Sequence, residues 1–99
     1  AFSGNLFDLL GAFQSVLYGI SREDFQKVFE EEVPMEQKME DMKRLLSERG
    51  SIWFHELFRG AVTKNELIAT FLALLEIIRS RFAQMVQEKR FGQIRITKI

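Results

Sequence analysis

The sequence predicts an α+β fold that is mainly helical, because one long helical pattern is followed directly by a hairpin pattern. Residues 64–80 carry apolar side chains at helical spacing. Thr63 and Glu66 stand three residues apart at the start of this segment, as the N-cap and the acid of a capping box do. Residues 82–88 and 93–99 then have the pattern of two strands joined by a turn.

Composition limits the class of protein. The 99 residues suffice for one compact domain with some additional chain, and 46% of them are hydrophobic and 28% charged. The formal net charge is zero, which argues against bulk DNA or an acidic membrane as a partner. The chain has no Cys, no apolar run that could span a bilayer and no signal peptide, so we expect a cytoplasmic location. Residue 1 is Ala, so we expect a fragment or a processed chain.

Charge is distributed unevenly along the chain. Residues 1–32 hold two cations against six carboxylates, and the remainder holds twelve cations against eight carboxylates. This asymmetry indicates two functional parts. We expect residues 1–33 to be a helix and linker that bind a partner, and residues 34–99 to form the folded C-terminal domain.

The first of these parts is expected to contain a helix over residues 5–19. An apolar set recurs there at helical spacing, namely Leu6, Leu10, Phe13 and Leu17. This face either binds a partner or docks on its own domain. Residues 20–33 are interpreted as an extended linker ending at Pro34, and the run Glu30 to Glu32 as a solvated charge run rather than a metal site or a site for a basic partner.

The second part begins with a helix over residues 34–49, which we expect to turn an apolar stripe toward the core. The stripe consists of Met35, Met39, Met42, Leu45 and Leu46. A short strand at 51–53 and a short helix at 54–58 follow. His55, the single histidine, is expected at the surface rather than in a catalytic site.

The order helix, short strand, short helix, long helix and hairpin is that of a winged-helix domain with a β-hairpin wing, preceded here by the extra N-terminal helix and linker. Many winged helices read DNA with the third helix, which then needs cations on its outward side. In this chain the side opposite the apolar arc contains two carboxylates and no cation: Glu66, Ala69, Thr70, Ala73, Glu76 and Ile77. Reading of DNA by this helix is therefore not expected.

The apolar arc of the same helix is wider than one buried stripe. We expect one flank, formed by Leu67, Leu74 and Ile78, to pack inside. The other flank, formed by Ile68, Leu72 and Leu75 with Phe71 at its boundary, is expected to meet a partner. The alternative is that both flanks are buried in a small, tight core.

Four segments, in this order, resemble the family of segregation and condensation protein A, the bacterial kleisin. They are Asp8 to Gln14, Val33 to Met39, Phe54 to Phe58, and Thr70 to Glu76 with Gln87 and Phe91 to Ile94. The resemblance covers almost the whole chain, whereas residues between Leu17 and Val33 match poorly. It implies a non-enzymatic adaptor that works at the nucleoid in chromosome condensation and segregation.

The resemblance also implies two partners. The winged helix would dock on the ATPase head of an SMC protein through Ile68, Phe71, Leu72 and Leu75, with support from the hairpin. The N-terminal helix would dock on a dimer of segregation and condensation protein B through Leu6, Leu10, Phe13 and Leu17. No cofactor, metal, membrane or small-molecule substrate is implied.

Two other classes were compared with this interpretation. A DNA-binding protein would use the basic residues of the wing, which are Lys89, Arg90, Arg95 and Lys98. An enzyme would need a nucleophile with its base, a phosphate loop or a metal-ligand cluster, and we identify none in the sequence. No catalytic residue is therefore assigned.

Overall fold

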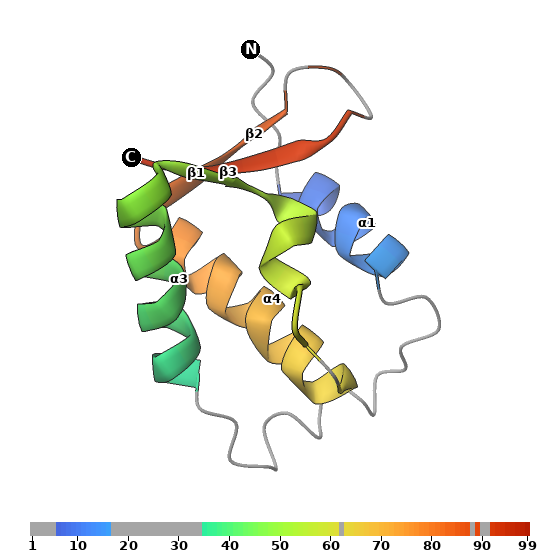
Figure 1. Ribbon diagram of the computed structural model, residues 1–99. Helices are drawn as coiled ribbons and strands as arrows, with labels where there is room; N and C mark the ends of the chain where they lie inside the picture. The colour runs from blue at the N-terminus through green and yellow to red at the C-terminus, as the bar shows by residue number, and fades with distance from the viewer. Residues whose placement is uncertain (1–5, 17–34, 62, 88, 90–91) are drawn as a thin grey trace.

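The computed structural model describes residues 6–16, 35–61, 63–87, 89 and 92–99 (Figure 1). In chain order the elements are α1 (Leu6–Val16), α3 (Met35–Arg49), β1 (Ser51–Trp53), the 3-10 helix η1 (Phe54–Phe58), α4 (Lys64–Arg79), β2 (Ala83–Gln87) and β3 (Ile94–Lys98). The expected α+β, mainly helical class is confirmed. The linker expected at 20–33 lies outside the described residues.

The strands form one antiparallel sheet of order β1-β3-β2 that lies across one end of the helices (Figure 1). Ile96 of β3 pairs with Ile52 on one side and with Met85 on the other, and all three side chains are buried. The next row, Trp53, Arg95 and Val86, points to the opposite face and is half-buried. Along β3, Ile94 and Ile96 therefore lie on the core face, and Arg95 and Thr97 lie on the other.

Helix α4 passes through the middle of the domain. Its N-cap is Thr63, whose hydroxyl oxygen accepts the backbone N–H of Glu66 at 3.1 Å, as predicted. The helix ends at Arg79 in a Schellman turn, where the N–H of Arg81 donates to the carbonyl of Ile78 and the N–H of Phe82 donates to that of Ile77, both at 3.0 Å. This turn leads the chain directly into β2.

Helix α3 packs beside α4 and presents the expected methionine stripe to the core. Met42 and Leu46 are buried, and Met35, Met39 and Leu45 pack half-buried against them. Gly50 ends the helix with a positive φ of 79°. Its N–H donates to the carbonyl of Leu46 at 2.7 Å, and its own carbonyl accepts the N–H of Lys98 from β3 at 2.9 Å. The turn therefore fixes the position of the sheet on the helices.

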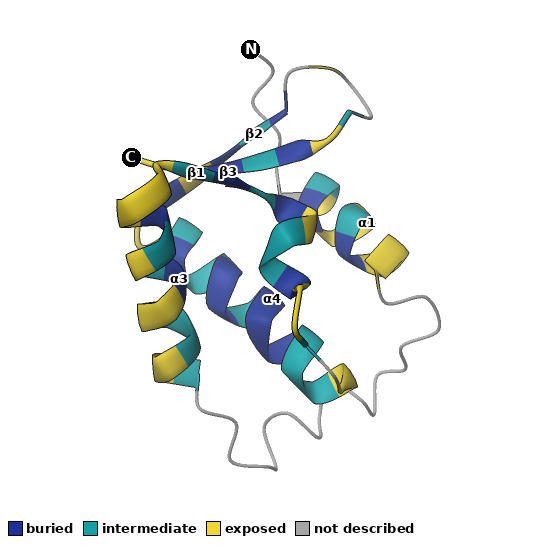
Figure 2. Ribbon diagram, in the orientation of Figure 1, coloured by how far each residue is buried: buried dark blue, intermediate teal, exposed yellow. Residues whose placement is uncertain are grey.

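Helix α1 also packs on this core. Leu9 and Phe13 are buried in the same hydrophobic cluster as the residues of α4 and the sheet. Figure 2 shows one side of α1 turned inward and the other exposed. Of the two alternatives left open by the sequence, the structure has the helix docked on its own chain. The functional division at residue 33 stays a prediction.

Candidate partner-binding surface

The surface expected to meet a partner lies on α4, and the structure places its four residues at two depths. Leu72 and Leu75 are half-buried. Ile68 is fully buried and Phe71 is 3% exposed. The expectation that Ile68 belongs to an outward flank is therefore wrong, as is the outward placement of Phe71 at its boundary.

The side of α4 predicted to be outward is largely covered as well. Ala69, Thr70, Ala73 and Ile77 are buried, while Leu67 and Ile78, expected inside, are only half-buried. The cause is the position of α4 between α3 and η1, with β2 against its C-terminal end and α1 beside it (Figure 1). A helix that is covered from several directions does not have the single buried face that a surface helix has.

Phe71 is buried because it belongs to an aromatic cluster. Its ring stacks on that of Phe13 from α1, with 3.9 Å between centroids and 4° between planes. Phe13 in turn lies 5.6 Å from Phe58 of η1, which meets Phe54 edge-on at 5.0 Å. Large aromatic side chains supply much of the energy of such contacts. The cluster therefore joins α1, η1 and α4.

The expected B-subunit face of α1 is divided between inside and outside. Phe13 is 1% exposed, whereas Leu10 is 40% exposed. Leu17 lies outside the described residues, as does the side chain of Leu6. The pair turned to the core is Leu9 and Phe13, four residues apart. The sequence leaves the choice between Leu9 and Leu10 open, because adjacent leucines fit two overlapping helical faces equally well.

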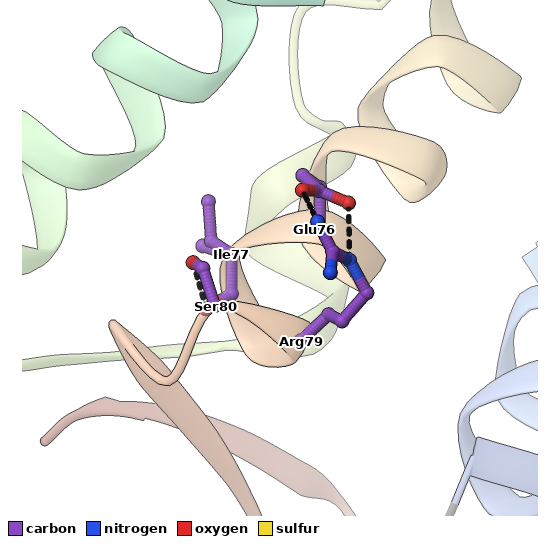
Figure 3. Close-up of polar contacts among 4 residues, drawn as sticks. All are labelled: Glu76, Ile77, Arg79 and Ser80. Atoms are coloured by element: carbon purple, nitrogen blue, oxygen red, sulfur yellow. Dashed lines mark hydrogen bonds and ion pairs between the residues drawn. The ribbon is translucent and has the colours of Figure 1, made fainter.

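The C-terminal end of α4 carries a charge pair at its surface. The guanidinium of Arg79 donates to both carboxylate oxygens of Glu76, with 2.9 Å from Nε to Oε2 (Figure 3). The hydrogen bond from Arg79 lowers the pKa of Glu76, and the same bond raises the pKa of Arg79. The hydroxyl of Ser80 donates to the carbonyl of Ile77 at 3.2 Å (Figure 3). The cation at this end is thus already matched by a carboxylate.

Two basic residues of the hairpin, Arg95 and Lys98, lie against aromatic rings. The guanidinium of Arg95 lies 4.5 Å from the ring of Trp53, and Nζ of Lys98 lies 5.6 Å from that of Phe82. Lys89 is exposed, and Arg90 lies outside the described residues. A hollow of about 180 Å³ opens on this face of the sheet, lined by Trp53, Val86, Lys89, Gly92, Gln93 and Arg95. The place of Trp53 beside Arg95 could not be predicted from the sequence, because it depends on the strand register.

Within the described residues, no helix is long and apolar enough to cross a membrane. The same part of the chain holds no group of three or more His, Asp or Glu side chains placed to bind a metal ion. The described surface of α4, β1 and the hairpin offers the half-buried Leu72 and Leu75, the ring of Trp53 and the exposed cation of Lys89.

Comparison with known proteins identifies the family of this chain. The family described as Segregation and condensation protein ScpA matches residues 2–99. The chain belongs to this family. The resemblance predicted from the four sequence segments is confirmed.

Relatives from several bacteria are similar along nearly the whole chain. Segregation and condensation protein A of Bacillus licheniformis is 37% identical over 98 residues, which are 96% of this chain and 39% of the relative. The protein of the same name from Bacillus subtilis is 35% identical over 98 residues, with the same two coverages. That of Streptococcus sanguinis is 34% identical over 91 residues, or 88% of this chain and 38% of the relative. The chain therefore spans about two fifths of the length of these relatives.

Proposed function

We propose that this chain belongs to a non-enzymatic kleisin adaptor of an SMC complex, acting in chromosome condensation and segregation at the nucleoid. The observation that carries the proposal is the family match over residues 2–99. The relatives bear names that state segregation and condensation. The proposed role needs no cofactor, because an adaptor acts through the proteins that it joins.

The proposed fold behind this role is the winged helix. Helices α3 and α4, the short η1 and the β2–β3 hairpin follow one another in the order expected of that fold. The strand β1 completes the sheet by pairing with β3. In this interpretation α4 is the third helix, and the hairpin, which carries Lys89, Arg95 and Lys98, is the wing.

The ATPase head of an SMC protein is the proposed partner of this surface. Leu72 and Leu75 are the accessible part of the proposed α4 contact, whereas Ile68 and Phe71 are buried. The hollow beside Trp53 is lined by residues of β1 and the hairpin and by none of α4, and it can receive a side chain of a partner. Accessible apolar and aromatic side chains are the kind of feature on which protein interfaces are centred.

A dimer of segregation and condensation protein B is the proposed partner of α1. Leu10 is accessible, and Phe13 becomes so when α1 leaves its seat on α4. Leu6 and Leu17 complete the proposed face.

The test is separate co-purification of this chain with an SMC head domain and with the B subunit, followed by size-exclusion chromatography with light scattering. We expect a stoichiometric complex with each. If the chain forms a complex with neither partner, the adaptor role is refuted. If it binds only one of them, the proposal holds for that partner alone.

A further inference from the structure

The two proposed binding faces meet in one contact. Phe13 is assigned to the B-subunit face and Phe71 to the SMC-head face, yet their rings stack at 3.9 Å and lie 4° from parallel. Both side chains are almost completely buried. While this stack is formed, neither ring can be offered to a second protein.

Helix α1 packs on the core in the way that an amphipathic helix packs in an apolar groove. Leu9 and Phe13 point inward from successive turns of α1 and are buried. Phe58 of η1 provides the second wall, 5.6 Å from the ring of Phe13. Two anchor side chains one turn apart are typical of an amphipathic helix in a groove. In the structure this groove is therefore occupied by α1, a segment of the same chain.

We propose that α1 is an internal competitor for the SMC head: its docking covers Phe71, and the head must displace it to reach that residue. This inference rests on the proposed function. The chain would exist in a closed state, with Phe13 on Phe71, and an open state, with both rings accessible. The apparent affinity for the head is then the intrinsic affinity reduced by the fraction of chains that are open.

Competition at one contact couples the two partners. The B subunit favours the open state by capturing the released α1, and the head favours it by capturing Phe71. Each partner therefore raises the affinity of the chain for the other, by the same factor. An isolated helix as short as α1 is marginal in water, so capture by the B subunit would also replace the apolar support that α1 loses.

The decisive measurement is the position of α1 in the whole chain with and without the SMC head. The chain contains no Cys, so Ser15→Cys on α1 and Glu48→Cys on α3 introduce two unique labelling positions, both exposed. Both substitutions leave Phe13 and Phe71 in place. We expect the distance between two spin labels, measured by pulsed electron paramagnetic resonance, to lengthen at saturating head. An unchanged distance while the head is bound would overturn the proposal.

Affinity gives a second readout. Phe13→Ala removes the stack on Phe71 and is expected to tighten head binding by about tenfold, within the usual range of coupling between sites. Gln14→Ala changes an exposed neighbour on the same helix and is expected to bind as the unsubstituted chain does. Circular dichroism shows whether Phe13→Ala remains folded, and if it does not, the labelled chain decides alone.

The outcomes separate this inference from the function on which it rests. A bound head with α1 still seated, or Phe13→Ala that is folded and binds no more tightly, overturns the competition but leaves the adaptor role intact. Failure of the labelled chain and of the unsubstituted chain to bind the head overturns both.

Discussion

The guanidinium of Arg49 lies 3.3 Å from the carboxylate of Glu56, so that the last residue of α3 is tied to η1. The other oxygen of Glu56 accepts the backbone N–H of Trp53 at 3.3 Å. One carboxylate therefore connects the end of a helix, the end of β1 and the 3-10 turn that carries Phe54 and Phe58. Partial burial opposes ionisation of Glu56, but the hydrogen bond from Trp53, followed by the bond and charge of Arg49, outweighs it and lowers its pKa below the ordinary value of 4.5.

This lowered pKa makes stability depend on pH through Glu56. Because the folded pKa is depressed, the contribution is fully present above pH 4.5 and is lost as pH falls through the folded pKa. We expect Glu56→Gln to lower the thermal midpoint at neutral pH, and the difference from the unsubstituted chain to shrink in acid. Glu48→Gln, at an exposed position of α3, is the matched control. Equal losses at neutral and acid pH would contradict the electrostatic origin.

Two helix ends predict opposite effects of glycine. Arg81 adopts a φ of 63° in the turn after α4, in the left-handed region that is costly for a residue with a Cβ. We expect Arg81→Gly to raise the free energy of unfolding by about 0.5–1 kcal/mol, after allowance for the greater freedom of unfolded glycine. Urea denaturation measures the change, and a loss of stability would show that the Arg81 side chain makes stabilising contacts.

Gly50 is the counterpart at the end of α3, with a φ of 79°. A Cβ at this position would meet no atom within 4 Å, so the effect of Gly50→Ala is a backbone effect. We expect a loss of about 1 kcal/mol in the same urea experiment. A neutral result would mean that the turn after α3 can relax to another conformation.

The hairpin is closed by a partly buried polar contact. Nε2 of Gln87 donates to the backbone carbonyl of Gly92 at 2.7 Å, and the Gln87 side chain lies on the core side of the sheet. Gln87→Leu removes the donor and is expected to cost about 1–3 kcal/mol of stability. Gln84→Leu, at an exposed position of the same strand, is the control and should change stability by less than about 0.5 kcal/mol. Equal effects of the two substitutions would show that the bond to Gly92 contributes little.

Substitutions of half-buried residues on α4 are expected to affect binding, and substitutions of buried residues are expected to affect folding. We expect Leu72→Arg and Leu75→Arg to weaken binding of the SMC head by about tenfold or more, because a charge would face an apolar partner, while most of the thermal midpoint is kept. Phe71→Arg instead disrupts the stack with Phe13 and is expected to lower the free energy of unfolding by about 3–5 kcal/mol. Isothermal titration and thermal melts distinguish the two cases. Unchanged head affinity in both leucine variants would remove α4 from the interface.

The hairpin cations allow a test of the alternative function. Arg95 and Lys98 lie against aromatic rings, and Arg79 is paired with Glu76. We expect no mobility shift of duplex DNA at low salt, because the net charge is zero and the side of α4 opposite its apolar arc contains two carboxylates and no cation. A salt-dependent shift that is lost on substitution of Lys89 and Arg90 would establish DNA binding by the wing.

Local chemistry made several elements predictable. The hydroxyl of Thr63 fixes the start of α4, because it accepts an N–H that otherwise has no partner in the first turn. Strict alternation places Ile94 and Ile96 on one face of β3, since successive strand residues point to opposite sides. The methionine stripe of α3 was predictable for a similar reason: α3 is covered on one side, so its apolar side chains mark the buried face.

Which faces of α1 and α4 are buried was decided only by the tertiary structure. By itself, the sequence determined which segments are helix and strand, and which family the chain resembles. It did not determine that Ile68 and Phe71 are buried, because elements distant in the sequence pack around α4; the ring that stacks on Phe71 is that of Phe13 from α1. Helical periodicity reports one preferred face, whereas burial depends on every element that packs around a helix. The stack of Phe13 on Phe71, and with it the competition proposed for α1, is therefore a property of the tertiary structure alone.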